Sequence, residues 1–326
     1  MIPRPLGPSR ERGAALLTVF LLVAVMATVS ATALDRLALA TRLSGNVMEA
    51  GQARRWLGMA EELAVVRMED MLASSPERTT LAGNWQDTPR TIELPDGARI
   101  TARVRDGGNC FNLNSLAART SEGQLIVRPA AVDQFRALMT TLGIDPTAAT
   151  RISAAAADWI DHDSLPLPAG AEDREGHLVA NRAMAHESEL GKVPGMTPAI
   201  AIMLRPWICA LPTHDASPLN VNTLTAEQAP LLAMLIPERL TVEQARAALR
   251  SRPASGFPNV EAFWNSPALK SAEASGEAAS QVQVRTSFFR LEAWVSDGDD
   301  AVGETALLQF RDERVHVLRR DWSVVG

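Results

Sequence analysis

The stretch RGAALLTVFLLVAVMATVSATALDR, residues 12–36, decides the fold of this chain of 326 residues. Its apolar part, residues 14–33, contains no charged side chain, and a helix of that length extends about 30 Å, the thickness of a bilayer core. Arg4, Arg10 and Arg12 precede it, so the positive-inside rule predicts a cytoplasmic N-terminus and an exported remainder. A secretory signal cleaved at a small-x-small site within ATVSATA, residues 27–33, is the alternative.

The sequence that follows the apolar stretch continues with helical periodicity. Apolar residues recur at roughly helical spacing as far as Leu72, and no proline interrupts residues 9–75. A single helix over residues 14–72, apolar in its first half and amphipathic in its second, is typical of type IV pilin-like proteins. In that group a peptidase cuts on the cytoplasmic side after a glycine, which here predicts cleavage between Gly13 and Ala14. Such proteins usually have glutamate at the fifth mature position, where this chain has Thr18.

Composition limits the partners and the covalent chemistry of the chain. It is 46% hydrophobic, which is enough for one large or two smaller cores, and its net charge of -6 disfavours a partner bound through phosphates. Its two cysteines, Cys110 and Cys209, are too few for a zinc finger but enough for one disulfide. Because the predicted topology exports both to an oxidising periplasm, we expect a Cys110–Cys209 bond; two buried free thiols are the alternative.

Strand patterns lie on both sides of a long alanine-rich block. Residues 98–105 alternate apolar and polar side chains, and the C-terminal region repeats the same period of two. The sequence therefore predicts an α+β protein with a pilin-like fold, in which a long N-terminal helix packs on a small antiparallel sheet and a large α-helical domain is inserted between strands. The expected boundaries are a cytoplasmic leader (1–13), a transmembrane segment (14–33), the first part of the pilin-like domain (34–115), the inserted helical domain (116–275) and C-terminal strands (276–326).

The predicted insertion contains a repeated motif and a hairpin. NLNSL at 112–116 returns as NVNTL at 220–224, and Asn, Ser and Thr commonly cap helices. SELGKVPGMTPAI, residues 188–200, predicts a helix–turn–helix hairpin of the kind found in helix-hairpin-helix modules. A membrane-anchored periplasmic nucleic-acid-binding protein is therefore an alternative function. It is disfavoured because Lys192 is the only lysine of the hairpin and acidic residues surround it.

An acidic segment is the main chemical signal. DWIDHDSLPLPAGAED, residues 158–173, places five carboxylates on a proline- and glycine-interrupted loop: Asp158, Asp161, Asp163, Glu172 and Asp173. Oxygen ligands on an irregular loop suit calcium, although the EF-hand pattern is absent. The alternatives are a solvated acidic loop and a carboxylate hydrolase. No other feature supports a catalytic centre, so we do not expect an enzyme.

In combination, these motifs resemble the type II secretion system protein K family of minor pseudopilins. The resemblance rests on Gly13 before the apolar run, followed in order by FNLNSL, DWIDHD, ELGKVPGM and LNVNTL. It implies a pilin fold with a large helical insertion, a single-pass bacterial inner-membrane anchor with the bulk of the chain in the periplasm, and processing by the prepilin peptidase.

The resemblance also implies a place in an assembly. It predicts a role in protein export at the pseudopilus tip, together with the minor pseudopilins I and J and next to the major pseudopilin, without nucleic acid. Family members also resemble this chain in lacking the fifth-position glutamate, so Thr18 becomes a candidate mark of the tip position. The resemblance further implies calcium in the helical domain, which falls here on residues 158–173.

Overall fold

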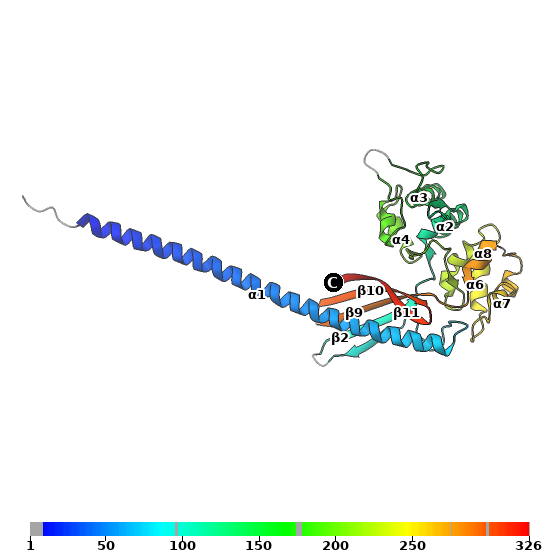
Figure 1. Ribbon diagram of the computed structural model, residues 1–326, viewed down its shortest axis with the longest axis horizontal. Helices are drawn as coiled ribbons and strands as arrows, with labels where there is room; N and C mark the ends of the chain where they lie inside the picture. The colour runs from blue at the N-terminus through cyan, green and yellow to red at the C-terminus, as the bar shows by residue number, and fades with distance from the viewer. Residues whose placement is uncertain (1–8, 95–96, 174–177, 275, 298–299, 326) are drawn as a thin grey trace, which may run out of the picture. The chain divides into compact units, whose positions relative to one another are not determined.

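The computed structural model describes residues 9–94, 97–173, 178–274, 276–297 and 300–325, and the chain divides into two compact units, residues 1–58 and 59–326. Helix α1, Ser9–Ser74, begins in the first unit and ends in the second (Figure 1). The predicted helix over 14–72 therefore forms. Residues 1–8 of the predicted leader lie outside the described residues, whereas the Gly13–Ala14 bond lies within α1.

The first unit presents its apolar side chains outward. From Ala14 to Met48 they are exposed, and the most apolar window of the helix has a mean hydropathy of 2.4, whereas Leu57 near the end of the unit is buried. Thr18 Oγ1 donates a hydrogen bond to the carbonyl of Ala15 at 2.8 Å, so its hydroxyl is satisfied within the helix. A single apolar helix of this kind fits a membrane anchor.

The second unit is built on one antiparallel sheet. Its strand order is β1-β2-β9-β10-β11, and its members are β1 (Arg90–Glu93), β2 (Arg99–Asp106), β9 (Phe288–Asp297), β10 (Asp300–Arg311) and β11 (Arg314–Val325). Met68 and Leu72 of α1 are buried with residues of β9, β10 and β11 in one hydrophobic cluster. The α+β pilin-like fold predicted from sequence is thus confirmed.

The helical domain interrupts a pair of neighbouring strands. Asp106 of β2 is the register partner of Phe289 of β9, so everything from 107 to 287 is inserted between them. Gly107 opens the insertion, and a Cβ at this position would lie 2.8 Å from the Phe289 carbonyl carbon, so the close approach of the two chains requires glycine. The inserted segment is wider at both ends than the predicted 116–275.

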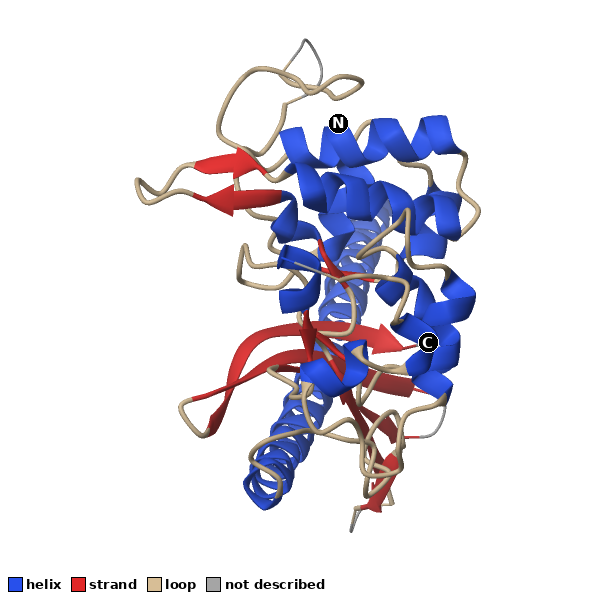
Figure 2. Cartoon of the chain, turned by 90° about the vertical axis from the view of Figure 1, so that its right-hand side faces the viewer, coloured by secondary structure: helices blue, strands red, loops and turns tan. Residues whose placement is uncertain are grey.

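Short elements make up the insertion, whose helices gather to one side of the sheet (Figure 2). The α-helices are α2 (Pro129–Thr141), α3 (Pro146–Asp158), α4 (Pro198–Leu204), α5 (Ala229–Ala233), α6 (Val242–Arg250), α7 (Val260–Trp264) and α8 (Gly276–Gln281). The 3-10 helices are η1 (Leu113–Leu116), η2 (Glu187–Lys192), η3 (Ala226–Gln228) and η4 (Pro267–Leu269). Three two-stranded pairs complete it: β3 (Phe111–Asn112) with β6 (Ile208–Cys209), β4 (Ala117–Arg119) with β5 (Leu125–Val127), and β7 (Leu219–Asn220) with β8 (Val282–Gln283).

The insertion has its own hydrophobic core and well-defined helix starts. Phe111 and Phe135 stack with ring centroids 4.8 Å apart, and both are fully buried. Asp145 caps α3 by accepting from the amide of Ala148, and Pro146 follows it at the first helical position. The predicted hairpin at 188–200 consists of η2 and α4, so its first arm is a 3-10 helix and not an α-helix.

Candidate functional site

Three of the five predicted carboxylates come together where α3 ends. Asp158 is the last residue of α3, Asp161 follows on the next turn, and Glu172 lies on the loop that returns to them. Asp158 and Asp161 are buried, and one oxygen from each of the three side chains lies within 4.8 Å of the others. Asp163 and Asp173 are exposed and do not belong to this group. We refer to Asp158, Asp161 and Glu172 as the acidic cluster.

The loop is held over the cluster by Asp158 itself. Its carboxylate accepts hydrogen bonds from the amide of Leu167 at 3.1 Å and from the amide of Ala171 at 2.7 Å. Gly170 lies so close that a Cβ there would be 1.9 Å from Asp158 Oδ2. The glycine of the sequence segment is therefore required by contact with the cluster.

Within the part of the chain that the structure describes, no positive side chain pairs with the cluster. Both carboxylate oxygens of Asp161 and one of Glu172 are buried and have no hydrogen-bond partner among the described residues. Burial, followed by the charges of Asp163, Asp158 and Glu172, raises the pKa of Asp161 to about 7. Burial and neighbouring carboxylates raise the pKa of Asp158 and of Glu172 as well. Among the described residues, no lysine or arginine forms an ion pair with the cluster.

This arrangement fits a hard divalent cation. Two oxygens bound to one calcium ion at about 2.4 Å lie at most about 4.8 Å apart, and the cluster oxygens meet that limit. Unpartnered buried carboxylate oxygens are costly unless a proton or a cation neutralises them. The three side chains could thus supply ligands to calcium, and the remaining positions would be open to further oxygens.

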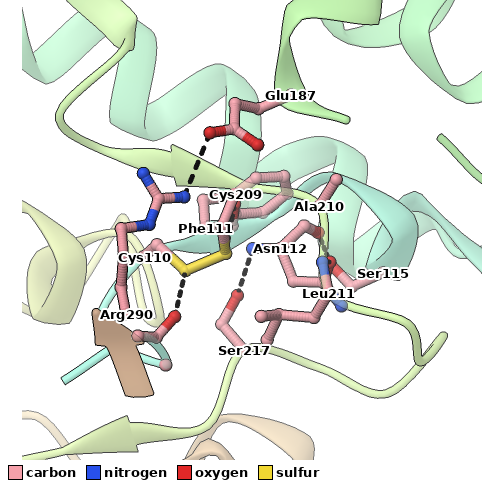
Figure 3. The surroundings of a disulfide bond; sticks show 12 residues. Cys110, Phe111, Asn112, Ser115, Glu187, Cys209, Ala210, Leu211, Ser217 and Arg290 are labelled. Carbon is pink, nitrogen blue, oxygen red and sulfur yellow. Dashed lines mark hydrogen bonds and ion pairs between the residues drawn. A yellow bond between two sulfur atoms is a disulfide. The ribbon is translucent and has the colours of Figure 1, made fainter. Parts of the chain in front are cut away.

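The two cysteines form a disulfide bond. Cys110 and Cys209, 99 residues apart in sequence, have Cα atoms separated by 5.8 Å (Figure 3). The parallel pair β3–β6 brings them together, because Asn112 is the register partner of Cys209. Both cysteines are buried beside Phe288 and Leu307 of the sheet. The bond therefore lies where the insertion meets the pilin-like domain.

The repeated N-x-N motif is structural in both copies. Asn112 caps η1 as expected, by accepting from the amide of Asn114. The second asparagine of each copy does something that sequence reasoning missed: Asn114 exchanges two hydrogen bonds with the backbone of Met184, and Asn222 exchanges two with the backbone of Phe257. Each buried amide thus ties a distant loop to its motif, and nothing in the sequence indicates the partner.

Sequence reasoning also missed the role of Asp106, a buried aspartate at the end of β2. Asp106 accepts from Gly108 at 2.9 Å and from Thr223 Oγ1 at 2.6 Å, and Thr286 Oγ1 also donates to it. Burial raises its pKa to about 6, although the two hydroxyls lower it. In sequence Asp106 is merely a strand end. In the structure it joins the departing and returning ends of the insertion.

The 3-10 helix η2, which begins one residue before the predicted hairpin, contacts the sheet through its first residue. Glu187, at the start of η2, accepts from Arg290 of β9 at 3.0 Å (Figure 3) and pairs with Arg319 of β11 at 3.3 Å. The charges of these arginines lower the pKa of Glu187 against the opposing effect of burial. This segment therefore carries a domain contact in which an acid meets two arginines.

Comparison with known proteins gives a consistent result. Two family models described as type II secretion system (T2SS), protein K, match residues 109–213 and 219–285. The chain is 33% identical over 322 residues to the type II secretion system protein K of Klebsiella pneumoniae, covering 97% of each chain. It is 33% identical over 326 residues to that of Aeromonas hydrophila, covering 95% of this chain and 97% of the relative.

A solved structure is similar as well. The crystal structure of the GspK-GspI-GspJ complex from the enterotoxigenic Escherichia coli type 2 secretion system contains a chain that is 29% identical and superposes with a TM-score of 0.74. The match covers 86% of this chain and 99% of that chain.

Proposed function

The chain belongs to the type II secretion system protein K family and is a minor pseudopilin, and on this premise we propose that it assembles with the minor pseudopilins I and J at the tip of the pseudopilus. The single observation that carries this proposal is the similarity to one chain of the solved complex, because it extends over nearly the whole of that chain. The family is a structural component of secretion machinery, and the role we propose is assembly without catalysis.

The proposed assembly is tested by co-purification. The full chain carries an affinity tag and is co-expressed with the minor pseudopilins I and J of the same bacterium. After extraction in detergent, both partners should co-purify with the tagged chain. A tagged chain that folds, as judged by its melting transition, but retains neither subunit would refute the proposal. Deletion of the chain should also abolish export of the type II substrates of that bacterium.

The membrane anchor and its processing follow from the same premise. We place the apolar part of α1 in the inner membrane and the second unit in the periplasm, with the prepilin peptidase cutting between Gly13 and Ala14. Cleavage would remove three arginines and one glutamate, and the side-chain charge would change from -6 to -8. N-terminal sequencing of the membrane-bound protein should find Ala14. A start near Thr32 would indicate a cleaved secretory signal instead.

We further propose that the acidic cluster holds calcium. The support is that these oxygens of Asp161 and Glu172 have no hydrogen-bond partner among the described residues, and that other carboxylates surround Asp161. A bound cation would neutralise the carboxylates and order the loop of residues 158–173, and binding to the folded state alone would stabilise the domain.

The calcium proposal has its own test. A chelator should lower the melting temperature of the full chain, and calcium should restore it. Asp161→Asn should abolish that response, whereas Asp133→Asn, an exposed carboxylate on α2, should leave it intact. Equal melting temperatures with and without chelator in the unmodified chain would show that no stabilising cation is bound.

A further inference from the structure

An apolar groove runs between α1 and the outer edge of the sheet. It has a volume of about 620 Å³ and is walled on one side by α1 residues at helical spacing, including Ala60, Leu63, Ala64 and Met71. The inward-facing residues of β1 and β2 form the opposite wall. Met68 and Leu72 pack α1 over β9 and β10, and Ala102 and Val104 of β2 lie against the same hydrophobic cluster. The open part of the groove is farther out, where Leu63 of α1 and Ile92 of β1 are 45% and 46% exposed.

The sheet is wide enough for a second helix beside α1. Strands lie about 4.8 Å apart, so five strands extend roughly 19 Å between the outer two, whereas a helix with its side chains is about 10 Å wide. A single helix thus covers about half of such a sheet. An open apolar face of this kind is stabilised when another element packs on it.

Charge identifies the chemistry of the occupant. Among the described residues, the groove is lined by Arg67, Arg90 and Arg103 and by no acidic side chain, on a chain whose net charge is -6. Arg103 is already paired with Glu292 at 2.6 Å. Arg67 and Arg90 form no ion pair within the part of the chain that the structure describes. The rim is therefore positive, and two of its cations are available to a partner.

We infer, on the basis of the proposed function, that this groove receives an amphipathic helix of a neighbouring pseudopilin. The apolar face of that helix packs against α1 and the β1–β2 face, and its carboxylates pair with Arg67 and Arg90. The guest helix would lie beside α1 on the same side of the sheet. Tip assembly would then involve this groove on the chain and an acidic, amphipathic helix on its neighbour.

Site-specific photocrosslinking tests the groove directly. In the full chain co-expressed with the minor pseudopilins I and J, p-benzoylphenylalanine replaces Ile92, which lines the groove and is 46% exposed. The control replaces Ile126 of β5, which is 51% exposed and lies elsewhere. Crosslinks from position 92 alone, mapped by mass spectrometry to a helix of a partner, are expected. Crosslinks to a partner strand, to lipid alone, or to nothing would overturn the inference.

Charge reversal supplies a second, independent measurement. Arg67→Glu combined with Arg90→Glu should weaken partner binding by about tenfold or more, whereas Lys at both positions should retain it. Arg151→Glu, an exposed arginine on α3, is the matched control and should leave binding unchanged. If the variant with both charge reversals still co-purifies with its partners, the groove is not the binding surface, although the proposed tip assembly stands. Failure of the unmodified chain to co-purify instead refutes the proposed function, and the groove inference falls with it.

Discussion

Arg320 of β11 donates two hydrogen bonds to Glu61 of α1, each 2.7 Å long. A second carboxylate, Glu304 of β10, lies 3.5 Å from the same guanidinium and is 4% exposed. Two buried acids therefore share one arginine where α1 meets the sheet. Burial, followed by the charge of Glu61, raises the pKa of Glu304 to about 7, so this side chain is neutral in mildly acidic solution.

The first prediction concerns the pH dependence of stability. Because folding raises the pKa of Glu304, its contribution to stability is present below about pH 4.5 and is lost as the pH rises through 7. Glu304→Gln keeps the neutral form at every pH, so its melting temperature should fall less between pH 5 and pH 8, by on the order of a few degrees. Glu122→Gln, an exposed site, serves as the control. Identical pH profiles of Glu304→Gln and the unmodified chain would show that Glu304 is charged throughout.

The second prediction concerns the disulfide. Its 99-residue separation corresponds on the chain-entropy model to on the order of 4–5 kcal/mol of stabilisation. Replacing both Cys110 and Cys209 by alanine should lower the free energy of unfolding in urea by that amount. Thiol labelling of the denatured, unreduced protein checks the bond itself, since two reactive thiols would contradict it.

Gly170 supplies the third prediction. A methyl group at this position would collide with the Asp158 carboxylate, whereas nothing lies within 4 Å of a Cβ at Gly191. Gly170→Ala should therefore cost about 1–3 kcal/mol of stability and weaken calcium binding, and Gly191→Ala should do neither. Calorimetric titration with calcium measures the second effect. Equal behaviour of the two variants would mean that the loop does not close over the cluster.

The fourth prediction concerns Thr18. In pilin-like filaments, the fifth-position glutamate is thought to pair with the terminal ammonium of a neighbouring subunit, and a subunit at the tip has no neighbour ahead of it. An unpaired carboxylate in an apolar bundle costs several kcal/mol. Thr18→Glu should thus reduce membrane insertion or secretion, and Thr18→Val should be nearly silent. If the Thr18→Glu variant secretes normally, the absence of glutamate at this position does not mark a tip subunit.

Local patterns made the overall architecture predictable. The uncharged stretch and the proline-free continuation indicated α1, and the period of two in β2 and β9 indicated a half-buried sheet. Both signals depend on residues a few positions apart, which is the range over which helix and strand geometry repeat. The acidic segment was equally visible, although the structure gathers only Asp158, Asp161 and Glu172.

Contacts between distant segments could not be predicted in the same way. In the sequence Asp106 is an ordinary strand end. In the structure its carboxylate accepts hydrogen bonds from Thr223 and Thr286, which are more than a hundred residues away. Asn222 has a structural role because it hydrogen-bonds to the backbone of Phe257. The raised pKa of Glu304 likewise depends on Glu61 of α1. Burial raises the energetic importance of such groups, but burial is a property of the assembled fold.

The junction at Asp106 and Phe289 has a consequence for how such chains diversify. These residues are neighbours in adjacent antiparallel strands, and Gly107 donates to the carbonyl of Phe288 at 2.8 Å, so the insertion leaves and re-enters the sheet at one point. A tight hairpin turn would satisfy the same two strand ends, and loop length adds only slowly to the cost of closure. The helical domain is therefore inserted at a single point of the sheet. The strand register of β2 and β9 is accordingly compatible with insertions of different length at this point.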